Sequence, residues 1–252
     1  MRNLIYRLYE NKLERALRAA DLPKHIGVIV DGNRRWATKQ GGKAKQGHLA
    51  GAQKIPQFLQ WCDELGIKVV TIYLLSTDNL TGRSASELEA LQKIIGGLAT
   101  ELADVGRYRI QLVGDREAIP DQLLGTLVKA QSRTKNIDGV HVNLAIAYGG
   151  RKEIADAMRS IVKTHAKAGK SLDALAEILT PELIAEHLYT SGQPDPDLLI
   201  RTSGEQRLSG FLLWQSANSE FYVAEALWPD FRRVDFLRAL RDFQSRHRRF
   251  GK

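Results

Sequence analysis

The stretch HIGVIVDGNRRW, residues 25–36, decides the fold of this chain. It opens with an apolar run, residues 25–31, of the type found in strands that are buried on both faces of a sheet. A turn with Gly32 follows, and then a helical pattern that Gly66 ends. The apolar positions of that helix, three and four residues apart, are Ile55, Phe58, Leu59, Cys62 and Leu65. A strand that leads into a helix is the repeating unit of a parallel α/β sheet.

The same alternation continues along the chain. Further strands are predicted at residues 68–75, 108–113, 141–147 and 197–201, with a short last strand at 211–214. Helices are predicted at residues 87–102, 122–132, 152–164 and 233–249. Strands that alternate with helices predict a single-domain, mainly parallel sheet of about six strands flanked by helices. We expect residues 1–21 to form an amphipathic helix ahead of a catalytic domain at 22–252.

Composition limits the partners and the compartment. Lys and Arg outnumber Asp and Glu by 37 to 29, a formal charge of +8, which favours anionic partners such as nucleic acid, acidic lipid or phosphorylated small molecules. The single Cys62 excludes a disulfide framework and fits a reducing compartment. The longest apolar runs fall far short of the roughly 20 residues of a membrane-spanning helix. We therefore expect a cytoplasmic protein with at most peripheral membrane contact.

Polar, basic and glycine-rich residues follow the predicted strands, at the edge of the sheet where ligands of such folds bind. An Asp31-Gly32-Asn33 turn leads into Arg34 and Arg35. One carboxylate among arginines and free backbone amides suits a Mg²⁺-diphosphate. The alternative is that Asp31 merely caps a helix. The nucleotide motifs G-x-x-x-x-G-K-[ST] and G-x-G-x-x-G are both absent from the sequence.

A second basic segment follows the predicted strand at 197–201. Arg201 and Arg207 stand six positions apart around a Ser203-Gly204 turn, so that both guanidinium groups and the Ser209 hydroxyl can converge on one diphosphate. A solvated loop is the alternative.

Three motifs carry a resemblance to a known family: HIGVIVDGNRRWA at residues 25–37, STDN at 76–79 and IRTSGEQRLSGFLLWQ at 200–215. In this order they resemble the signatures of the cis-prenyltransferases, the undecaprenyl and Z-farnesyl diphosphate synthase family. The resemblance runs from about residue 22 to the C-terminus and is strongest to short-chain actinobacterial Z-isoprenyl diphosphate synthases. It implies that the chain condenses isopentenyl diphosphate with an allylic diphosphate and forms a Z double bond.

The resemblance also implies roles for single residues. Asp31 and Glu220 would hold Mg²⁺, and Ser76 and Asn79 would support Asp31 and the leaving group. The allylic diphosphate would be bound by Gly32, Asn33, Arg34, Arg35, Trp36 and His48. Isopentenyl diphosphate would be bound by Arg201, Arg207 and Ser209. Arg83 and Glu87 would belong to a mobile loop that closes over the substrate, with Arg83 among the substrate-binding residues. Arg249 and Gly251 would reach the partner's site in a homodimer.

Two positions depart from the family pattern. An arginine four residues before the motif histidine is replaced by Ala44, with Lys43 and Lys45 on either side. The residue after Asn79, commonly Trp, is Leu80. The first change leaves open whether a lysine replaces the missing phosphate contact.

Product length is expected to depend on Leu74, two residues before Ser76. Many long-chain members of the family look to have a smaller residue, alanine, at this position. A leucine that projects into the product channel would stop elongation after one or two additions, which predicts Z,E-farnesyl diphosphate from geranyl diphosphate. The alternatives are that Leu74 only packs against a helix and that the product is long.

The sequence also allows two other functions. A catalytically silent partner subunit of the same fold would be marked by loss of Asp31 or Asn33, and both are present. Nucleic-acid binding is suggested by the arginine-rich C-terminal helix, but Phe236, Leu237 and Leu240 give that helix an apolar face for packing. The N-terminal helix, with Leu4, Leu8 and Leu17, is interpreted either as a packing helix or as a contact with anionic lipid.

Overall fold

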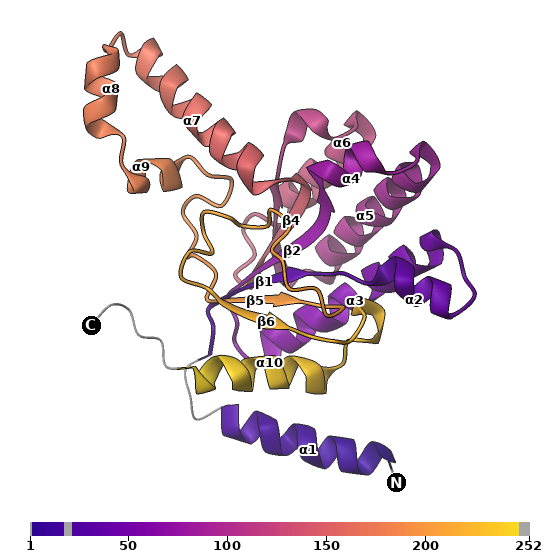
Figure 1. The fold of residues 1–252 in the computed structure, drawn as a ribbon. Helices are drawn as coiled ribbons and strands as arrows, with labels where there is room; N and C mark the ends of the chain where they lie inside the picture. Colours follow the sequence, from indigo (N-terminus) through magenta and orange to yellow (C-terminus); the bar gives the residue numbers. More distant parts are fainter. Residues whose placement is uncertain (1, 18–21, 247–252) are drawn as a thin grey trace.

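A computed structural model describes residues 2–17 and 22–246. Its centre is one six-stranded sheet with the strand order β3-β4-β2-β1-β5-β6, in which every neighbouring pair is parallel (Figure 1). The strands are β1 (His25–Ile29), β2 (Val69–Ser76), β3 (Tyr108–Val113), β4 (Val140–Tyr148), β5 (Leu198–Arg201) and β6 (Glu220–Val223). The predicted fold class, a mainly parallel sheet of about six strands flanked by helices, is confirmed.

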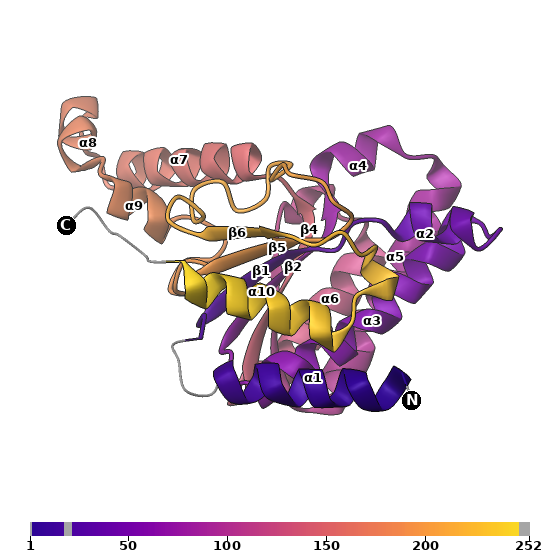
Figure 2. The same cartoon turned by 60° about the horizontal axis from the view of Figure 1, so that its bottom comes forward.

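The helices connect these strands. They are α1 (Arg2–Leu17), α2 (Asn33–Lys39), α3 (Ala44–Glu64), α4 (Thr77–Gly82), α5 (Ala85–Val105), α6 (Asp121–Thr134), α7 (Gly150–Lys167), α8 (Leu172–Ile178), α9 (Pro181–Glu186) and α10 (Arg233–Ser245). Figure 2 shows α2 and α4, which follow β1 and β2, at the same end of the sheet. Because all strands are parallel, this end collects the carboxyl ends of the strands.

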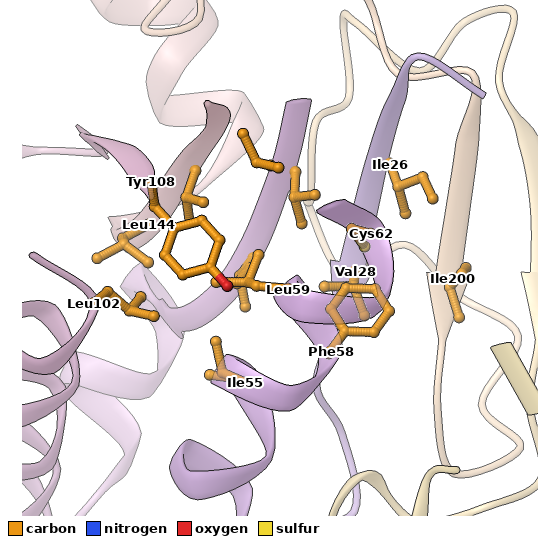
Figure 3. Packing of buried hydrophobic residues seen from close by; sticks show 14 of the residues in the cluster. Ile26, Val28, Ile55, Phe58, Leu59, Cys62, Leu102, Tyr108, Leu144 and Ile200 are labelled. Atoms are coloured by element: carbon orange, nitrogen blue, oxygen red, sulfur yellow. The ribbon is translucent and has the colours of Figure 1, made fainter. Parts of the chain in front are cut away.

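The side chains of each strand alternate between two apolar clusters. The larger cluster includes Val28 and Ile200 from the sheet and Phe58 from α3, all fully buried. Figure 3 shows α3 presenting Ile55, Phe58, Leu59 and Cys62 toward the sheet, as the spacing of these residues predicts. The smaller cluster, on the other face, contains the next residue of each strand, among them Ile29, Tyr73 and Leu199.

The prediction of a strand at residues 211–214 is wrong. Ser209, Gly210 and Leu212 have positive φ angles of 49°, 79° and 44°, so the backbone here turns instead of extending. The apolar side chains of Phe211 and Leu212 are buried in the smaller cluster, which explains the apolar run without a strand. The sixth strand is β6, which pairs with β5.

Helices α1 and α10 lie side by side below the sheet (Figures 1 and 2). Leu13 and Leu17 of α1 are buried in the larger cluster. On α10 the predicted apolar face is buried, with Phe236, Leu237 and Leu240 fully inaccessible. The interpretation of both helices as packing helices is therefore confirmed for the described side chains, to which those of Leu4 and Leu8 do not belong. Within the described ranges, none of the helices has the length and apolar character needed to cross a bilayer.

Candidate active site

A cavity of about 370 Å³ opens where β1, β2 and β5 end. Most of the side chains that the sequence predicts for the site line it: Asp31, Gly32, Asn33, Arg34, Arg35, His48, Leu74, Ser76, Asn79, Arg83, Arg201, Arg207 and Ser209. These residues are far apart in the sequence. They lie close together because β2, β1 and β5 are neighbours in the sheet. The predicted residues therefore share one cavity.

Asp31 and Arg201 form the centre of the cavity. The register places Arg201 opposite Ile29, two residues before Asp31, and Arg201 Nη2 donates to Asp31 Oδ2 at 2.8 Å. Burial alone would raise the pKa of Asp31, but hydrogen bonds from Arg201 and from the Gly32 amide outweigh it and lower the pKa. Asp31 is therefore a carboxylate beside the guanidinium group of Arg201, whose side chain is 5% exposed.

The turn after β1 requires glycine. Gly32 has a φ of +101°, and its amide donates to Asp31 Oδ1 at 2.6 Å. A Cβ atom there would lie 3.1 Å from Leu227 Cα. The next residue, Asn33, lies against two glycines of α3, since Cβ atoms on Gly47 and Gly51 would lie 2.0 and 2.3 Å from Asn33 oxygens. Close packing of α2 on α3 thus fixes the backbone that carries Asp31.

The loop after β5 carries the second group of basic side chains. Arg201 Nη1 donates to Ser209 Oγ at 2.8 Å and also to the Arg207 carbonyl. These two hydrogen bonds fold the loop back over the end of β5. The Arg207 side chain is 68% exposed and donates to Glu205 at 2.6 Å. Arg201 is therefore fixed, whereas Arg207 lies at the surface of the site.

His48 of α3 contacts Arg83, in the short segment between α4 and α5, and Glu87, in the first turn of α5. Arg83 Nη1 lies 2.7 Å from Glu87 Oε1 and 3.0 Å from His48 Nε2, and His48 Nε2 lies 2.9 Å from Glu87 Oε1. Burial, followed by the positive charge of Arg83, lowers the pKa of His48, although its hydrogen bond to Glu87 acts in the opposite direction. These three side chains join the predicted loop to α3.

An irregularity in β2 shapes the apolar wall. Tyr73 pairs with Ala145 but Leu75 pairs with Ile146, so Leu74 is an extra residue, and Ala147 is the extra residue on β4, with a φ of +52°. Without such a bulge, Leu74 and Leu75 would point to opposite faces. Instead both pack on the larger cluster and line the cavity.

The comparisons with known proteins agree with this geometry. Residues 29–251 match the family model described as putative undecaprenyl diphosphate synthase. The chain is 55% identical to the (2Z,6E)-farnesyl diphosphate synthase of Thermobifida fusca over 248 residues, 98% of this chain and 97% of that protein. It is 53% identical to isoprenyl transferase 1 of Streptomyces avermitilis over 251 residues, 100% of this chain and 97% of that protein.

This chain belongs to the undecaprenyl diphosphate synthase family of cis-prenyltransferases. Among solved structures, lavandulyl diphosphate synthase from Lavandula x intermedia in complex with dimethylallyl diphosphate is similar, with 34% identity and a TM-score of 0.85. The alignment covers 92% of this chain and 99% of that one. As a member of the family the chain is an enzyme, a prenyltransferase.

Two predicted site residues of this prenyltransferase lie elsewhere. Glu220 begins β6 and pairs with Leu198, at the amino end of the strand whose carboxyl end carries Arg201. Its carboxylate pairs with Arg246 at 2.9 Å. Glu220 therefore does not line the cavity that contains Asp31 of the same chain, and its role as a metal ligand stays a prediction. The Trp36 indole donates to Asp230 Oδ1 at 2.8 Å, and Trp36 does not line the cavity.

The remaining predictions concern two lysines near α3 and two residues at the C-terminus. Lys43 precedes α3, where its amide donates to Gln46, and neither Lys43 nor Lys45 lines the cavity. Arg249 and Gly251 lie outside the described residues.

Sequence reasoning missed Tyr73 and Thr202. Tyr73 lines the cavity and stacks on Phe211, and its hydroxyl lies 3.2 Å from the Ser209 carbonyl. Thr202 accepts from the Asp31 amide at 2.9 Å and donates to the Asp31 carbonyl at 2.7 Å. Thr202 lies inside the motif at residues 200–215 and Tyr73 lies three residues before the motif at 76–79. Only the contacts in the folded chain show which groups these two residues hold in place.

Proposed function

We propose that this enzyme adds one isopentenyl unit to a short allylic diphosphate, forming Z,E-farnesyl diphosphate from geranyl diphosphate. The observation that carries the proposal is the cavity itself, which joins a carboxylate, several arginines and an apolar wall. The names of two relatives at about half identity, (2Z,6E)-farnesyl diphosphate synthase and short-chain Z-isoprenyl diphosphate synthase, support the product class.

The reaction breaks the allylic C–O bond, and the diphosphate leaves with the electron pair. The allylic carbon bonds to the terminal alkene carbon of isopentenyl diphosphate, and the adduct then loses a proton to the released diphosphate. Negative charge grows on the leaving group, so fixed donors aimed at it lower the barrier. Gly32, Asn33, Arg34, Arg35 and His48 are proposed to bind this diphosphate, and Ser76 and Asn79 to support it.

Arg201, Arg207 and Ser209 are proposed to bind isopentenyl diphosphate. Arg201 is held by Asp31 and Ser209, so its planar donor group is already oriented before a substrate arrives. Holding the alkene close to the allylic carbon converts a bimolecular step into an effectively unimolecular one.

The donors fit a magnesium ion. Mg²⁺ commonly takes one or two carboxylates and completes its shell with substrate phosphates and water. The Asp31 carboxylate faces the cavity with its side chain 33% exposed. We propose that Asp31 holds Mg²⁺, which would neutralise charge on the leaving diphosphate.

The apolar wall supports a short product. A volume of about 370 Å³ lies near the lower end of ligand pockets, roughly 300–1,000 Å³. Leu74, Leu75 and Leu91 close the cavity on its apolar side. We propose that Leu74 is the residue that stops elongation.

A homodimer and a cytoplasmic location are part of the same proposal. Helices α7 and α8 project away from the sheet in Figure 1, and they carry the exposed apolar residues Val162 and Leu172, 43% and 78% exposed. A second copy of the chain would cover such residues. Analytical ultracentrifugation should show a dimer that Leu172→Asp weakens, and a monomer at micromolar concentration would contradict the proposal.

The buried free thiol of Cys62 suits the reducing environment of the cytoplasm. Cell fractionation can test the proposed cytoplasmic location.

The experiment that tests the function uses purified protein with Mg²⁺ and labelled isopentenyl diphosphate. Dimethylallyl, geranyl and farnesyl diphosphate are offered in turn, and the length and stereochemistry of the products are determined. We expect one addition to geranyl diphosphate with a new Z double bond. Long polyprenyl products would show a long-chain synthase instead, and no product with any starter would indicate a silent subunit.

A further inference from the structure

Glu205 lies between two arginines that belong to different parts of the site. Its Oε2 atom is 2.6 Å from Arg207 Nη1, and its Oε1 atom is 3.7 Å from Arg35 Nη2. Arg35 comes from α2, the helix that follows β1, and Arg207 comes from the loop after β5. On the function proposed above, Arg35 binds the allylic diphosphate and Arg207 the isopentenyl diphosphate. One carboxylate therefore contacts a guanidinium group of each subsite.

The pairing differs from the one between Asp31 and Arg201. Arg201 is almost fully buried and also bonds Ser209 and a carbonyl group, so it has a fixed position. The Arg35 and Arg207 side chains are 49% and 68% exposed, and Glu205 is 30% exposed. Arg35 also donates to Ser203 Oγ at 2.5 Å. Exposed ion pairs are weak, so a stronger anion can replace Glu205 at both arginines.

We propose that Glu205 competes with diphosphate for Arg35 and Arg207. When the two subsites are empty, the carboxylate neutralises both guanidinium groups, and a diphosphate must displace it to bind them. A phosphate oxygen and a carboxylate oxygen repel each other, so both cannot occupy the same donors. Glu205 thus lowers the affinity of the site for inorganic pyrophosphate, the product that must leave after each condensation.

The test compares the full-length wild type with Glu205→Gln, which keeps the shape of the side chain and removes its charge. Inorganic pyrophosphate is titrated calorimetrically in the presence of Mg²⁺ at fixed ionic strength. Since each exposed pair changes an equilibrium constant by only a few-fold, we expect the variant to bind pyrophosphate about threefold to tenfold more tightly. The difference should shrink in high salt, because salt screens exposed charges.

Glu225→Gln is the matched control. This exposed carboxylate approaches Gly204 in the same region, so its removal changes the net charge equally. We expect its pyrophosphate affinity to stay within about twofold of wild type, since its charge is not on the two arginines. Unfolding temperatures of both variants check the fold.

Unchanged or weaker pyrophosphate binding by Glu205→Gln would overturn the inference, and weaker binding would assign Glu205 to holding the ligand. If both variants bound pyrophosphate more tightly by the same factor, the change in net charge alone would explain the effect, and the inference would be overturned too. The proposed function is tested separately, since a wild type that makes no product would refute that function while the pyrophosphate titration still decides on Glu205.

Discussion

Asp31 and Arg201 lie 170 residues apart in the sequence and form an ion pair of 2.8 Å across the carboxyl ends of β1 and β5. The pair exists because β5 adds to the sheet beside β1 with Arg201 opposite Ile29. It links the turn proposed to hold the allylic diphosphate to the loop proposed to hold isopentenyl diphosphate. The carboxylate and the guanidinium group therefore fix each other's position.

Replacing the Asp31 carboxylate should affect both activity and stability. We expect Asp31→Asn to lower kcat/KM by about 10²–10³-fold, because a ligand of the proposed metal ion is lost. Removing the partner of Arg201 should also cost roughly 2–3 kcal/mol, somewhat less than for a fully buried pair. Steady-state kinetics and urea unfolding measure the two effects. Asp78→Asn, an exposed carboxylate of the same cavity, is the control, and an equal loss of activity there would contradict a special role for Asp31.

Leu74 should control product length. Leu74→Ala removes the side chain that closes the apolar wall, so products longer than C15 are expected, while Leu74→Phe should favour the shortest product. Mass spectrometry of the dephosphorylated products measures the distribution. Ile72→Val changes a fully buried residue of the same strand outside the cavity and should leave the distribution unchanged. The wild-type distribution in Leu74→Ala would refute the assignment.

Two glycine-to-alanine changes should have opposite effects. A Cβ atom on Gly47 would lie 2.0 Å from the Asn33 carbonyl oxygen, so Gly47→Ala must push α2 away from α3. We expect it to cost about 1–3 kcal/mol of unfolding free energy and to lower activity, because the turn that carries Asp31 shifts. Gly97 lies in α5 with no heavy atom within 4 Å of its Cβ position. Gly97→Ala should therefore stabilise the protein by about 0.5–1 kcal/mol with unchanged activity, as urea unfolding can show. Equal effects of both substitutions would disprove the packing argument.

Stability should fall in mild acid because of His25. Its Nδ1 lies 2.7 Å from the Pro194 carbonyl and its Nε2 lies 2.8 Å from Thr71 Oγ1, so the neutral ring donates to the first and accepts from the second. Burial lowers the pKa of His25 to about 4, with Asp197 acting to raise it and His141 to lower it. Below its ordinary pKa of about 6.5, the unfolded chain binds a proton that the folded chain does not. The stability is thus complete above pH 6.5 and is lost as the pH falls toward 4, by roughly 3 kcal/mol.

Urea unfolding between pH 4.5 and 7.5 checks this prediction. His25→Asn retains a side-chain N–H donor but does not titrate, so its stability should depend less on pH over this range. The control is His187→Gln, a partly exposed histidine whose removal should leave the pH dependence as in the wild type. Identical pH profiles for the wild type and His25→Asn would show that another group is responsible.

Much of the fold follows from the sequence. The strand at residues 108–113 has the predicted bounds, and β1, β2, β4 and β5 differ by only one or two residues at their ends. Buried parallel strands are unbroken apolar runs, so their pattern is easily recognised. The run at 211–214 is equally apolar, but it fills a space under a turn, which no local pattern distinguishes from a strand. In β6 only half-buried side chains occur, and its pairing with β5 could not be predicted.

The sequence by itself determined the parallel α/β architecture and the segments that form the site, because both depend on local patterns and on the rule that parallel strands end at one edge. Only the tertiary structure decided which side chains meet. It joined Asp31 to Arg201, placed Glu205 between Arg35 and Arg207, and moved Glu220 to the other end of the sheet. The physical reason is that strand register, bulges and left-handed turns fix positions to within an ångström, and these depend on contacts between residues far apart in the chain.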